Sequence, residues 1–382
     1  MEPAVSQPEP PMAKSWISSS SLVLLLSLAM VTLHLADATV PAIFILGDST
    51  ADVGTNNYLP ESTARADFPF NGIDFPFSRP TGRFSNGFNS ADYLGMYNWQ
   101  GYSKLMGQRR SPPPFLSLQN KTSRLMKHIV RGVNFASGGS GLLDTTGLSL
   151  GRVIPLGEQI QQFATVRNNL TAVMGPAATE SLLSKSVFLI SIGSNDIFNY
   201  YSSNGNSNKE EFLIALKSKY EDHLKNLFNL GARKFGIISV PPIGCCPSLR
   251  ALNPTGGCVE DLNDYARAFF STTEALFSKL SSEFKGMTYS LGNAYEMTMN
   301  VIENPLPFGL KELKTACCGA GKFNGESPCV PTANICSNRD EYLFWDLYHP
   351  TQAVAELAAL TLYGGALRFV TPFNFSQLAE VN

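Results

Sequence analysis

The residues in this chain most able to do chemistry are a serine near one end and an aspartate and a histidine near the other. Ser49 directly follows an apolar run in Phe44-Ile-Leu-Gly-Asp-Ser-Thr50, and Asp346 stands three residues before His349. Serine is a weak nucleophile at its free pKa, so it needs a neighbouring base, and that base needs a carboxylate to hold its tautomer. The two segments together predict a hydrolase triad, although Ser49 alone could equally be a helix cap.

Comparison of the four histidines favours His349 as the base. His34 falls in an N-terminal targeting segment, and we expect His223 on the charged side of an amphipathic helix and His128 in a basic stretch before a strand. Only His349 has an acid three residues before it, and a turn would let that carboxylate reach Nδ1 and leave Nε2 facing the nucleophile. The alternative is a histidine that caps the following helix.

Two further polar features could stabilise the negative charge that develops on a carbonyl oxygen during ester cleavage. In Ser137-Gly-Gly-Ser-Gly141, a residue without a side chain would let a backbone N–H approach the substrate closely. This stretch lacks the pattern of a phosphate loop and could also be a simple tight turn. Asn195 in Gly193-Ser-Asn-Asp196 could donate from its side chain, or could equally stabilise its own turn.

Short apolar runs alternate with helical patterns, which is typical of a parallel sheet with helices on its faces. The expected strands are 42–46, 132–136, 187–192, 235–240 and 287–291. Helical spacing from Phe212 to Leu227 predicts a crossover helix that ends near Gly231, and 352–369 is predicted to be a closing helix capped by Thr351. Ligands bind beyond the carboxyl ends of such strands, so the polar features should meet at one edge of the sheet.

Length and composition allow one large globular α/β domain. The chain has 382 residues, of which 44% are hydrophobic, and its formal net charge is -2. A charge this small gives no electrostatic footprint for nucleic acid, so no nucleic-acid partner is expected. Residues 58–114 are rich in Pro, Gly and Asn, which predicts long loops around a short helix at 89–94.

The first 38 residues have the features of a cleaved signal peptide, which leaves 39–382 as a single domain. Lys14 precedes an apolar stretch from Leu22 to Leu35, and Ala36-Asp-Ala38 supplies the small residues of a cleavage site. A retained anchor is the alternative, but the apolar run is shorter than the roughly 20 residues of a membrane span. We therefore expect a secreted, extracellular protein without a stable membrane span. Sequons predict N-glycosylation at Asn120, Asn169 and Asn374.

The seven cysteines cluster in short loops rich in Gly and Pro, which indicates local disulfides in a secreted chain. The expected pairs join Cys245 or Cys246 with Cys258, and Cys317 or Cys318 with Cys329 and Cys336. An odd count leaves one thiol unpaired. Zinc binding is the alternative, but the spacings match no C-x-x-C pair, so neither a metal nor a cofactor is expected.

Taken in order, these segments resemble the plant-type GDSL esterase/lipase family, a branch of the SGNH hydrolases. The matching motifs span nearly the whole mature sequence: Phe44-Ile-Leu-Gly-Asp-Ser-Thr-Ala-Asp-Val-Gly-Thr-Asn-Asn57, Pro80-Thr-Gly-Arg-Phe-Ser-Asn-Gly87, Asn134-Phe-Ala-Ser-Gly-Gly-Ser-Gly141, Ile192-Gly-Ser-Asn-Asp196, Cys317-Cys-Gly319 and Phe344-Trp-Asp-Leu-Tyr-His-Pro-Thr351. The resemblance implies a flavodoxin-like three-layer α/β/α fold with a mostly parallel five-stranded sheet. It also implies ester hydrolysis through a covalent acyl-enzyme.

The family pattern implies a role for each candidate residue. Ser49 would be the nucleophile, with Asp346 and His349 completing the triad, and the oxyanion donors would be Ser49, Gly138 and Asn195. The loop contains both Gly138 and Gly139, so the choice between them stays open.

Two segments depart from the family pattern. Thr50 stands where the family usually has Leu, and we expect its side chain to point away from the nucleophile and activity to survive. The stretch 96–111, with Trp99, Arg109 and Arg110, looks longer than usual and is expected to reshape an entrance loop.

The expected function is a secreted serine esterase or lipase that cleaves carboxylic esters of acyl lipids or related molecules. Two alternatives keep the same triad: a deacetylase of cell-wall polysaccharide, and an acyltransferase that uses another alcohol in place of water. A third is a binding protein that keeps the fold without turnover. The intact Ser49, Asp346, His349 and Asn195 argue against the third.

Overall fold

The structure is a computed structural model that describes residues 40–95, 106, 111–119, 122–204 and 208–381. The predicted signal peptide, the sequon residue Asn120 and most of the predicted entrance loop, including Trp99, Arg109 and Arg110, lie outside the described residues.

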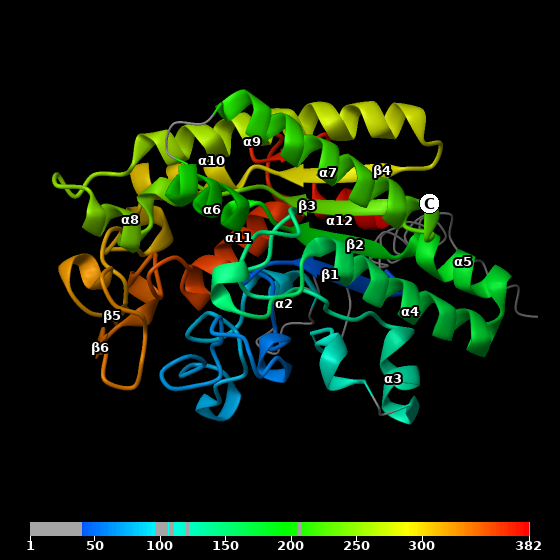
Figure 1. The fold of residues 1–382 in the computed structure, drawn as a ribbon, viewed down its shortest axis with the longest axis horizontal. Coiled ribbons are helices and arrows are strands. Elements are labelled where there is room, and N and C mark those ends of the chain that lie inside the picture. Colours follow the sequence, from blue (N-terminus) through cyan, green and yellow to red (C-terminus); the bar gives the residue numbers. More distant parts are fainter. Residues whose placement is uncertain (1–39, 96–105, 107–110, 120–121, 205–207, 382) are drawn as a thin grey trace, which may run out of the picture. The chain divides into compact units, whose positions relative to one another are not determined.

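A five-stranded sheet forms the centre of the described part (Figure 1). Its strands, in sheet order, are β1 (Ile43–Gly47), β2 (Val187–Ser191), β3 (Lys234–Ile238), β4 (Thr288–Gly292) and β7 (Val370–Thr371). The first four are parallel, and β7 pairs antiparallel with β4. The short strands β5 (Cys318–Gly319) and β6 (Asn334–Ile335) form a separate antiparallel pair. This is the mostly parallel five-stranded α/β fold that the resemblance implied.

Helices connect these strands and cover the sheet. They are α2 (Ser90–Gly95), α3 (Thr122–Ile129), α4 (Leu156–Met174), α5 (Pro176–Lys185), α6 (Ser194–Asn204), α7 (Lys209–Asn229), α8 (Pro247–Leu252), α9 (Glu260–Glu283), α10 (Ala294–Glu303), α11 (Gln352–Gly364) and α12 (Phe375–Glu380). The predicted short helix, crossover helix and Thr351 cap correspond to α2, α7 and the start of α11.

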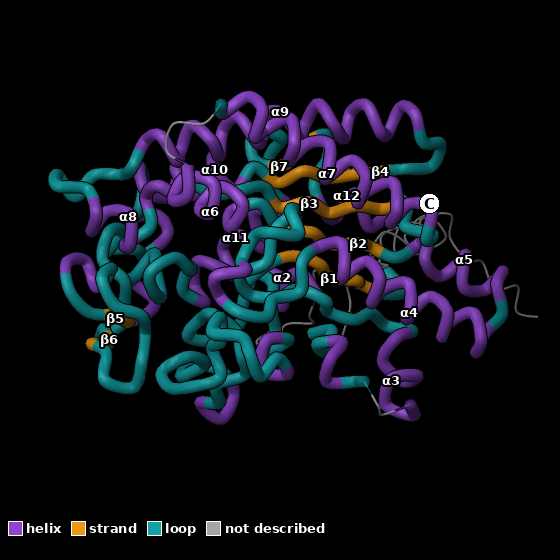
Figure 2. Tube along the Cα trace, viewed as in Figure 1, coloured by secondary structure: helices purple, strands orange, loops and turns teal. Residues whose placement is uncertain are grey.

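Alternating strand residues build the two halves of the core, because successive side chains point to opposite faces of a sheet. Phe44 and Phe188 contact each other and Phe163 of α4 on one face, which α7 and α9 also cover. Ile45 and Leu189 lie in a second apolar cluster with residues of α2, α11 and α12. Figure 2 shows the strands enclosed between helices. Because helices cover both faces of the sheet, a substrate site is expected at the carboxyl ends of the strands.

The predicted strand at 132–136 is wrong in detail, because it makes only isolated bridges instead of a continuous ladder. Its backbone does follow β1: Ile45 N–H donates to Val133 and Phe135 N–H donates to Ile45, at 3.0 and 2.7 Å. On its other side lies a proline-rich segment, where Asn134 N–H donates to Pro113 at 2.9 Å. Prolines have no N–H to continue a ladder, which accounts for the interruption.

The predicted closing helix is too long at its end. It stops at Gly364, with Gly365 as its C-cap, and the chain then forms β7 and α12. Glycine is a common helix terminator, so the pair of glycines was the signal for the earlier end. Within α12, Asn374 is the N-cap and forms a capping box with Gln377. Its glycosylation, like that of the partly exposed Asn169 in α4, stays a prediction.

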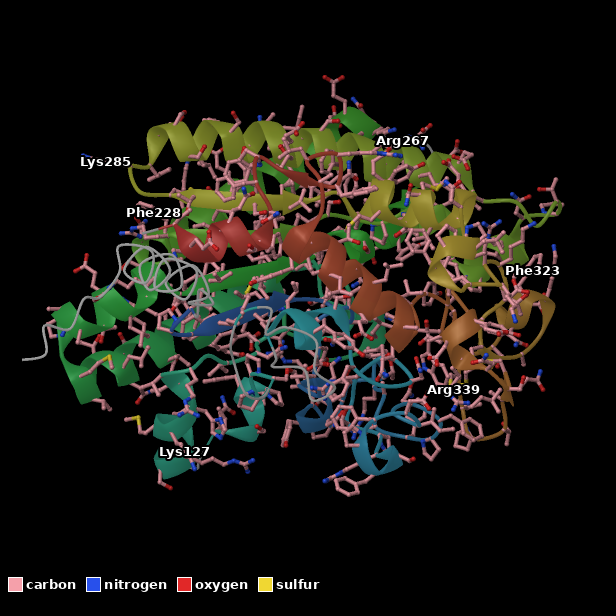
Figure 3. The ribbon with its side chains drawn as sticks, turned by 180° about the vertical axis from the view of Figure 1, so that it is seen from behind. Lys127, Phe228, Arg267, Lys285, Phe323 and Arg339 are labelled. Atoms are coloured by element: carbon pink, nitrogen blue, oxygen red, sulfur yellow. A yellow bond between two sulfur atoms is a disulfide. The ribbon has the colours of Figure 1, made fainter. Side chains whose placement is uncertain are left out.

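All seven cysteines lie in the described part, and six of them form local disulfides, as expected. The pairs are Cys245 with Cys258, Cys317 with Cys336, and Cys318 with Cys329. Cys246 is the buried free thiol. Arg339, labelled in Figure 3, forms an ion pair with Asp74 that joins the disulfide-bonded region to the loops before α2. No helix of the described residues is long and apolar enough to cross a membrane.

Candidate active site

One line of hydrogen bonds joins the serine, histidine and aspartate singled out in the sequence. His349 Nε2 lies 2.8 Å from Ser49 Oγ, and His349 Nδ1 lies 2.8 and 2.9 Å from the two carboxylate oxygens of Asp346. Ser49 follows β1, whereas Asp346 and His349 lie in the loop before α11. Because Nδ1 faces a carboxylate, it carries the ring proton, and Nε2 is left to accept the proton of the serine.

A tight turn explains the three-residue spacing of Asp346 and His349. The Oδ1 atom of Asp346 accepts backbone N–H groups from Tyr348 and His349, both at 2.9 Å, while it also bonds the imidazole. Trp345 N–H donates to His349 O at 2.7 Å, and its buried indole N–H donates to Asn71 Oδ1 at 3.0 Å. Backbone N–H groups therefore fix the Asp346 carboxylate in the position from which it orients the His349 ring.

Disulfide-bonded residues support this turn from behind. Cys317 N–H donates to Phe344 O at 2.9 Å, and Cys318 N–H donates to Trp345 O at 2.7 Å. Both cysteines and Trp345 belong to one small buried cluster. The two disulfides of the β5–β6 region thus anchor the segment that carries the acid and the base.

Burial and charge shift the pKa values of Asp346 and His349 in opposite directions. Asp346 and His349 are each only 9% exposed. Burial alone would raise the pKa of Asp346, but the charge of His349 and the hydrogen bonds to the carboxylate hold it below its ordinary value. Burial likewise opposes a charge on His349, but Asp346 and the more distant Asp48 raise its pKa above its ordinary value. The pair is built to stabilise an imidazolium.

Phe84 covers the imidazole and is a residue that the sequence reasoning did not single out. The centroid of its ring lies 4.9 Å from that of His349, with 33° between the planes. A Cβ atom on Gly138 would lie 2.7 Å from the Phe84 ring, so the ring also packs against the Gly-rich loop. The only signal in the sequence was its place in the motif 80–87.

The turn that carries Ser49 depends on Gly47. Its φ is +144°, and a Cβ atom there would lie 2.1 Å from Ser191 O, a separation no side chain can tolerate. Gln159 of α4 fixes the same residue from both sides, because its Oε1 accepts Gly47 N–H and its Nε2 donates to Gly47 O, each at 2.8 Å. The buried Gln159 was not predicted as part of the site.

The Gly-rich loop corrects one predicted residue. Gly138 N–H donates to Asp52 Oδ2 at 2.9 Å, and the other oxygen of Asp52 accepts the N–H groups of Gly54 and Thr55, both at 2.7 Å. The prediction of Gly138 as an oxyanion donor therefore conflicts with this structure, because its N–H is already bonded. The N–H of Gly139, the alternative in the same loop, donates to none of the described residues.

Asn195 lies in the first turn of α6 and reaches the same loop. Its Nδ2 atom donates to Ser140 O at 2.9 Å, which uses one of its two N–H bonds and leaves the other. The next residue, Asp196, is buried and accepts Leu142 N–H, Leu143 N–H and the Thr146 hydroxyl. Burial raises the pKa of Asp52 and of Asp196 to about 6.

His223 does not lie where the sequence predicted. It is 4% exposed, and its Nε2 lies 3.1 Å from Leu142 O, so it belongs to the buried face of α7. The charged neighbours of His223 in the sequence were misleading, because a loop far along the chain covers that side of the helix. His223 forms no hydrogen bond with the triad residues.

A cavity of about 220 Å³ is lined by residues that adjoin the triad in the chain. Thr50, Tyr348 and Pro350, which are neighbours of the nucleophile and the base in the chain, line it. Its walls continue between the carboxyl ends of β2 and β3 and the helices α10 and α11, with apolar side chains such as Met297 and Leu362. The cavity is mainly apolar, as binding sites for hydrophobic groups are.

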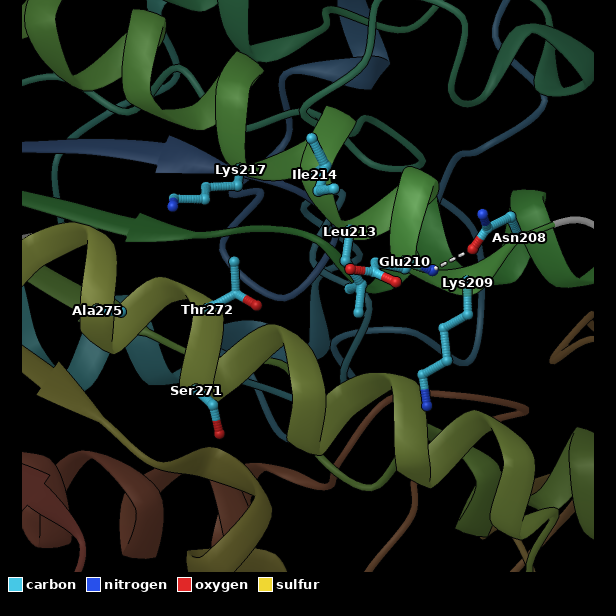
Figure 4. A pocket seen from close by; sticks show the side chains of 9 residues that line it. All are labelled: Asn208, Lys209, Glu210, Leu213, Ile214, Lys217, Ser271, Thr272 and Ala275. Atoms are coloured by element: carbon cyan, nitrogen blue, oxygen red, sulfur yellow. Dashed lines mark hydrogen bonds between the residues drawn. The ribbon is translucent and has the colours of Figure 1, made fainter.

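A second hollow, of about 690 Å³, lies open between α7 and α9 (Figure 4). Lys209, Lys217 and Ile214 are among its lining residues, and Asn208 caps α7 at its end. None of the triad residues lines it. The triad residues do not line the smaller cavity either, but their chain neighbours Thr50, Tyr348 and Pro350 do, so the smaller cavity is the candidate substrate site.

A serine, a histidine and an aspartate in one hydrogen-bonded line, at the carboxyl edge of an α/β sheet, form the constellation of serine hydrolases. The chain also matches the family model described as GDSL-like Lipase/Acylhydrolase over residues 43–362. It belongs to this family, whose members include plant GDSL esterase/lipases, and is a carboxylic ester hydrolase.

Curated relatives from Arabidopsis thaliana agree with that assignment. The chain is 37% identical to GDSL esterase/lipase At5g55050 over 90% of its own length and 91% of the relative. It is 35% identical to GDSL esterase/lipase LTL1 over 94% of its own length and 97% of the relative. A third relative, GDSL esterase/lipase 6, is 35% identical over 95% and 98%.

Proposed function

We propose that this protein is a secreted serine esterase or lipase that cleaves acyl esters through an acyl-enzyme on Ser49. The observation that carries the proposal is the line from Asp346 through His349 to Ser49, with each step at hydrogen-bond distance. A serine in contact with a base that is itself oriented by a carboxylate has the geometry of an activated nucleophile.

In the first half of the reaction, His349 takes the proton of Ser49 as Ser49 Oγ attacks the ester carbonyl. The Asp346 carboxylate stabilises the imidazolium that forms, which agrees with the raised pKa of His349. The carbonyl oxygen becomes negative in the tetrahedral intermediate. When this intermediate collapses, His349 gives its proton to the leaving alcohol, and the acyl group stays on Ser49.

We assign the oxyanion donors from the N–H groups that are free at the site. They are the backbone N–H of Ser49, the remaining side-chain N–H of Asn195 and the backbone N–H of Gly139 in place of Gly138. Donors held before the reaction stabilise the developing charge at little reorganisation cost. In the second half, His349 activates a water molecule, which releases the acid and restores Ser49.

The shape of the cavity favours an acyl lipid as substrate. An apolar cavity of about 150 Å³ holds benzene, so a cavity of about 220 Å³ has room for about nine carbons. A polysaccharide deacetylase would need room for little more than a methyl group and would favour an open cleft with aromatic residues for stacking on sugar. We therefore infer medium-length acyl esters as the preferred class.

Secretion forms part of the proposal. Three disulfides within the described residues suit an oxidising compartment, and the predicted signal peptide at 1–38 would direct the chain there, with 39–382 as the mature single domain. Mass spectrometry of the secreted protein would give the first mature residue, expected near Thr39, and would reveal glycans on Asn120, Asn169 and Asn374. An unprocessed N-terminus on the exported protein would contradict the cleavage site.

The test of the activity is a hydrolysis screen over p-nitrophenyl esters of increasing chain length and acetylated xylan, with Ser49→Ala as the control. We expect turnover that peaks at medium chains, no turnover by Ser49→Ala, and labelling of Ser49 by an organophosphonate. A crystal structure of that adduct should place its phosphoryl oxygen within hydrogen-bond distance of the N–H of Gly139. Equal inactivity of wild type and mutant would refute the enzyme, and transfer to an added alcohol without free acid would indicate a transferase.

A further inference from the structure

Thr50, which stands where relatives of this type usually have leucine, forms a polar group at the neck of the cavity. Its hydroxyl donates to Asp48 Oδ1 at 2.8 Å, and that same carboxylate oxygen accepts Thr50 N–H at 3.0 Å. Its Oγ1 also lies 2.8 Å from Ser191 Oγ at the end of β2. Thr50 and Ser191 both line the cavity, so this pair of hydroxyl groups belongs to its wall near the nucleophile. The side chain of Thr50 thus points toward the end of β2.

Counting protons fixes the direction of these hydrogen bonds. A threonine hydroxyl has one proton, and the proton of Thr50 is committed to the carboxylate of Asp48. Ser191 must then be the donor in its contact with Thr50, because a hydrogen bond needs one donor and one acceptor. No group of the described residues donates to Ser191 Oγ, so its lone pairs are free to accept a hydrogen bond from a molecule in the cavity.

We propose that Ser191, oriented by Thr50, makes this enzyme select acyl groups that carry a hydroxyl on the carbons nearest the ester carbonyl. The inference rests on the proposed function, in which the acyl group bound to Ser49 enters the cavity. Thr50 follows the nucleophile directly, and neighbouring Cα atoms lie about 3.8 Å apart, so the hydroxyl pair is within reach of the first few carbons. A hydroxyl there donates to Ser191, whereas a plain methylene leaves that acceptor without a partner.

The main test compares three p-nitrophenyl esters of equal chain length: octanoate, 3-hydroxyoctanoate and 8-hydroxyoctanoate. Each kcat/KM is divided by the alkaline hydrolysis rate of the same ester, which removes intrinsic reactivity. One hydrogen bond contributes about 1 kcal/mol, so we expect a preference of roughly fivefold to tenfold for the 3-hydroxy ester over octanoate. The 8-hydroxy ester carries its hydroxyl too far along the chain to reach Ser191, so it should show no such preference over octanoate.

Variants identify the acceptor and its orientation. Ser191→Ala should abolish the preference for the 3-hydroxy ester while octanoate turnover persists. Thr50→Val frees the Ser191 proton to point into the cavity, so the variant should no longer distinguish 3-hydroxyoctanoate from 3-methoxyoctanoate, which can only accept. Thr361→Val is the matched control, because Thr361 also lines the cavity but its hydroxyl donates to Leu357 O. Thr361→Val should keep the preference.

A binding measurement separates this inference from the proposed function. Titration calorimetry of Ser49→Ala with 3-hydroxyoctanoate and octanoate anions does not depend on turnover, and it should show tighter binding of the hydroxy acid. Thermal melts of each variant report whether it folds. Octanoate turnover without a 3-hydroxy preference, or equal affinities for the two acids, overturns the selection by Ser191 and leaves the esterase intact. Absence of turnover with every ester refutes the proposed function instead.

Discussion

Replacement of Asp346 by asparagine tests how the acid acts on the base. Asparagine has nearly the same shape, and its Oδ1 can keep the two backbone N–H bonds from Tyr348 and His349. Its NH₂ group then takes the place of Oδ2, 2.9 Å from His349 Nδ1, and donates to it. The ring is forced to carry its proton on Nε2, which faces Ser49 and can no longer accept.

The expected loss follows from that change of tautomer. Removal of the correct tautomer in a serine triad costs about 10⁴-fold in kcat, which corresponds to about 5.4 kcal/mol of barrier. The pH dependence should change as well. In the wild type, kcat/KM rises as His349 loses its proton, and Asp346 places this limb above the ordinary pKa of about 6.5. In Asp346→Asn the charge and the hydrogen bond of Asp346 are lost, and the lowering effect of burial is opposed only by the more distant Asp48, so the residual activity should rise at a lower pH than in the wild type.

The assay is hydrolysis of p-nitrophenyl octanoate from pH 4 to 9, with circular dichroism and thermal melts to establish that the variant is folded. A folded Asp346→Asn enzyme with less than a tenfold loss would refute this account of the triad. An acidic limb at the same pH as in the wild type would refute the electrostatic part alone.

Three further predictions concern the donors, the nucleophile turn and the disulfides. Asn195→Ala should lower kcat by about 10²-fold to 10³-fold with little change in KM, and a loss of only a few-fold in single-turnover assays would contradict its role. Gly47→Ala should destabilise the protein in urea unfolding far more than Gly309→Ala does, because both have positive φ but only Gly47 faces a backbone oxygen at 2.1 Å. Removal of the Cys318–Cys329 disulfide by double serine substitution should lower the free energy of unfolding by about 2–5 kcal/mol. It should also reduce kcat, because Cys318 N–H donates to Trp345 O, next to Asp346. An unchanged kcat would show that the turn of Asp346 does not need this disulfide.

The sequence predicted those parts of the fold that depend on local pattern. Strands β1 and β2 are nearly continuous apolar runs because both of their faces are buried, and β3 and β4 keep shorter apolar stretches, so all four stand out from the helices between them. The segment 132–136 is also partly apolar, but it makes only isolated bridges, and on the side away from β1 it faces a run of prolines that lack N–H groups. β7 has only two residues, too few for any periodicity to show.

The site residues likewise divide into those that the sequence could predict and those that it could not. Ser49, Asp346 and His349 could be found because their chemistry restricts the residue types and the Asp346 turn restricts the spacing. The Gly-rich loop could be found too, but the choice within it could not, because it depends on where the Asp52 carboxylate lies. Phe84 contributes through packing against His349. The sequence did not single it out, because many apolar residues could play such a role.

Four buried aspartates organise the site, and only one of them belongs to the triad. Asp48 holds Thr50, Asp52 holds the Gly-rich loop, Asp196 holds the loop that follows, and Asp346 holds His349. Burial raises the pKa of the first three, whereas the pKa of Asp346 is lowered, because Asp346 directly hydrogen-bonds the imidazole. The other three therefore cost stability when they ionise, and the N–H and O–H donors that they fix in place are the compensation. A site held this way keeps its donors aligned before substrate arrives, which is the condition for electrostatic stabilisation of an oxyanion.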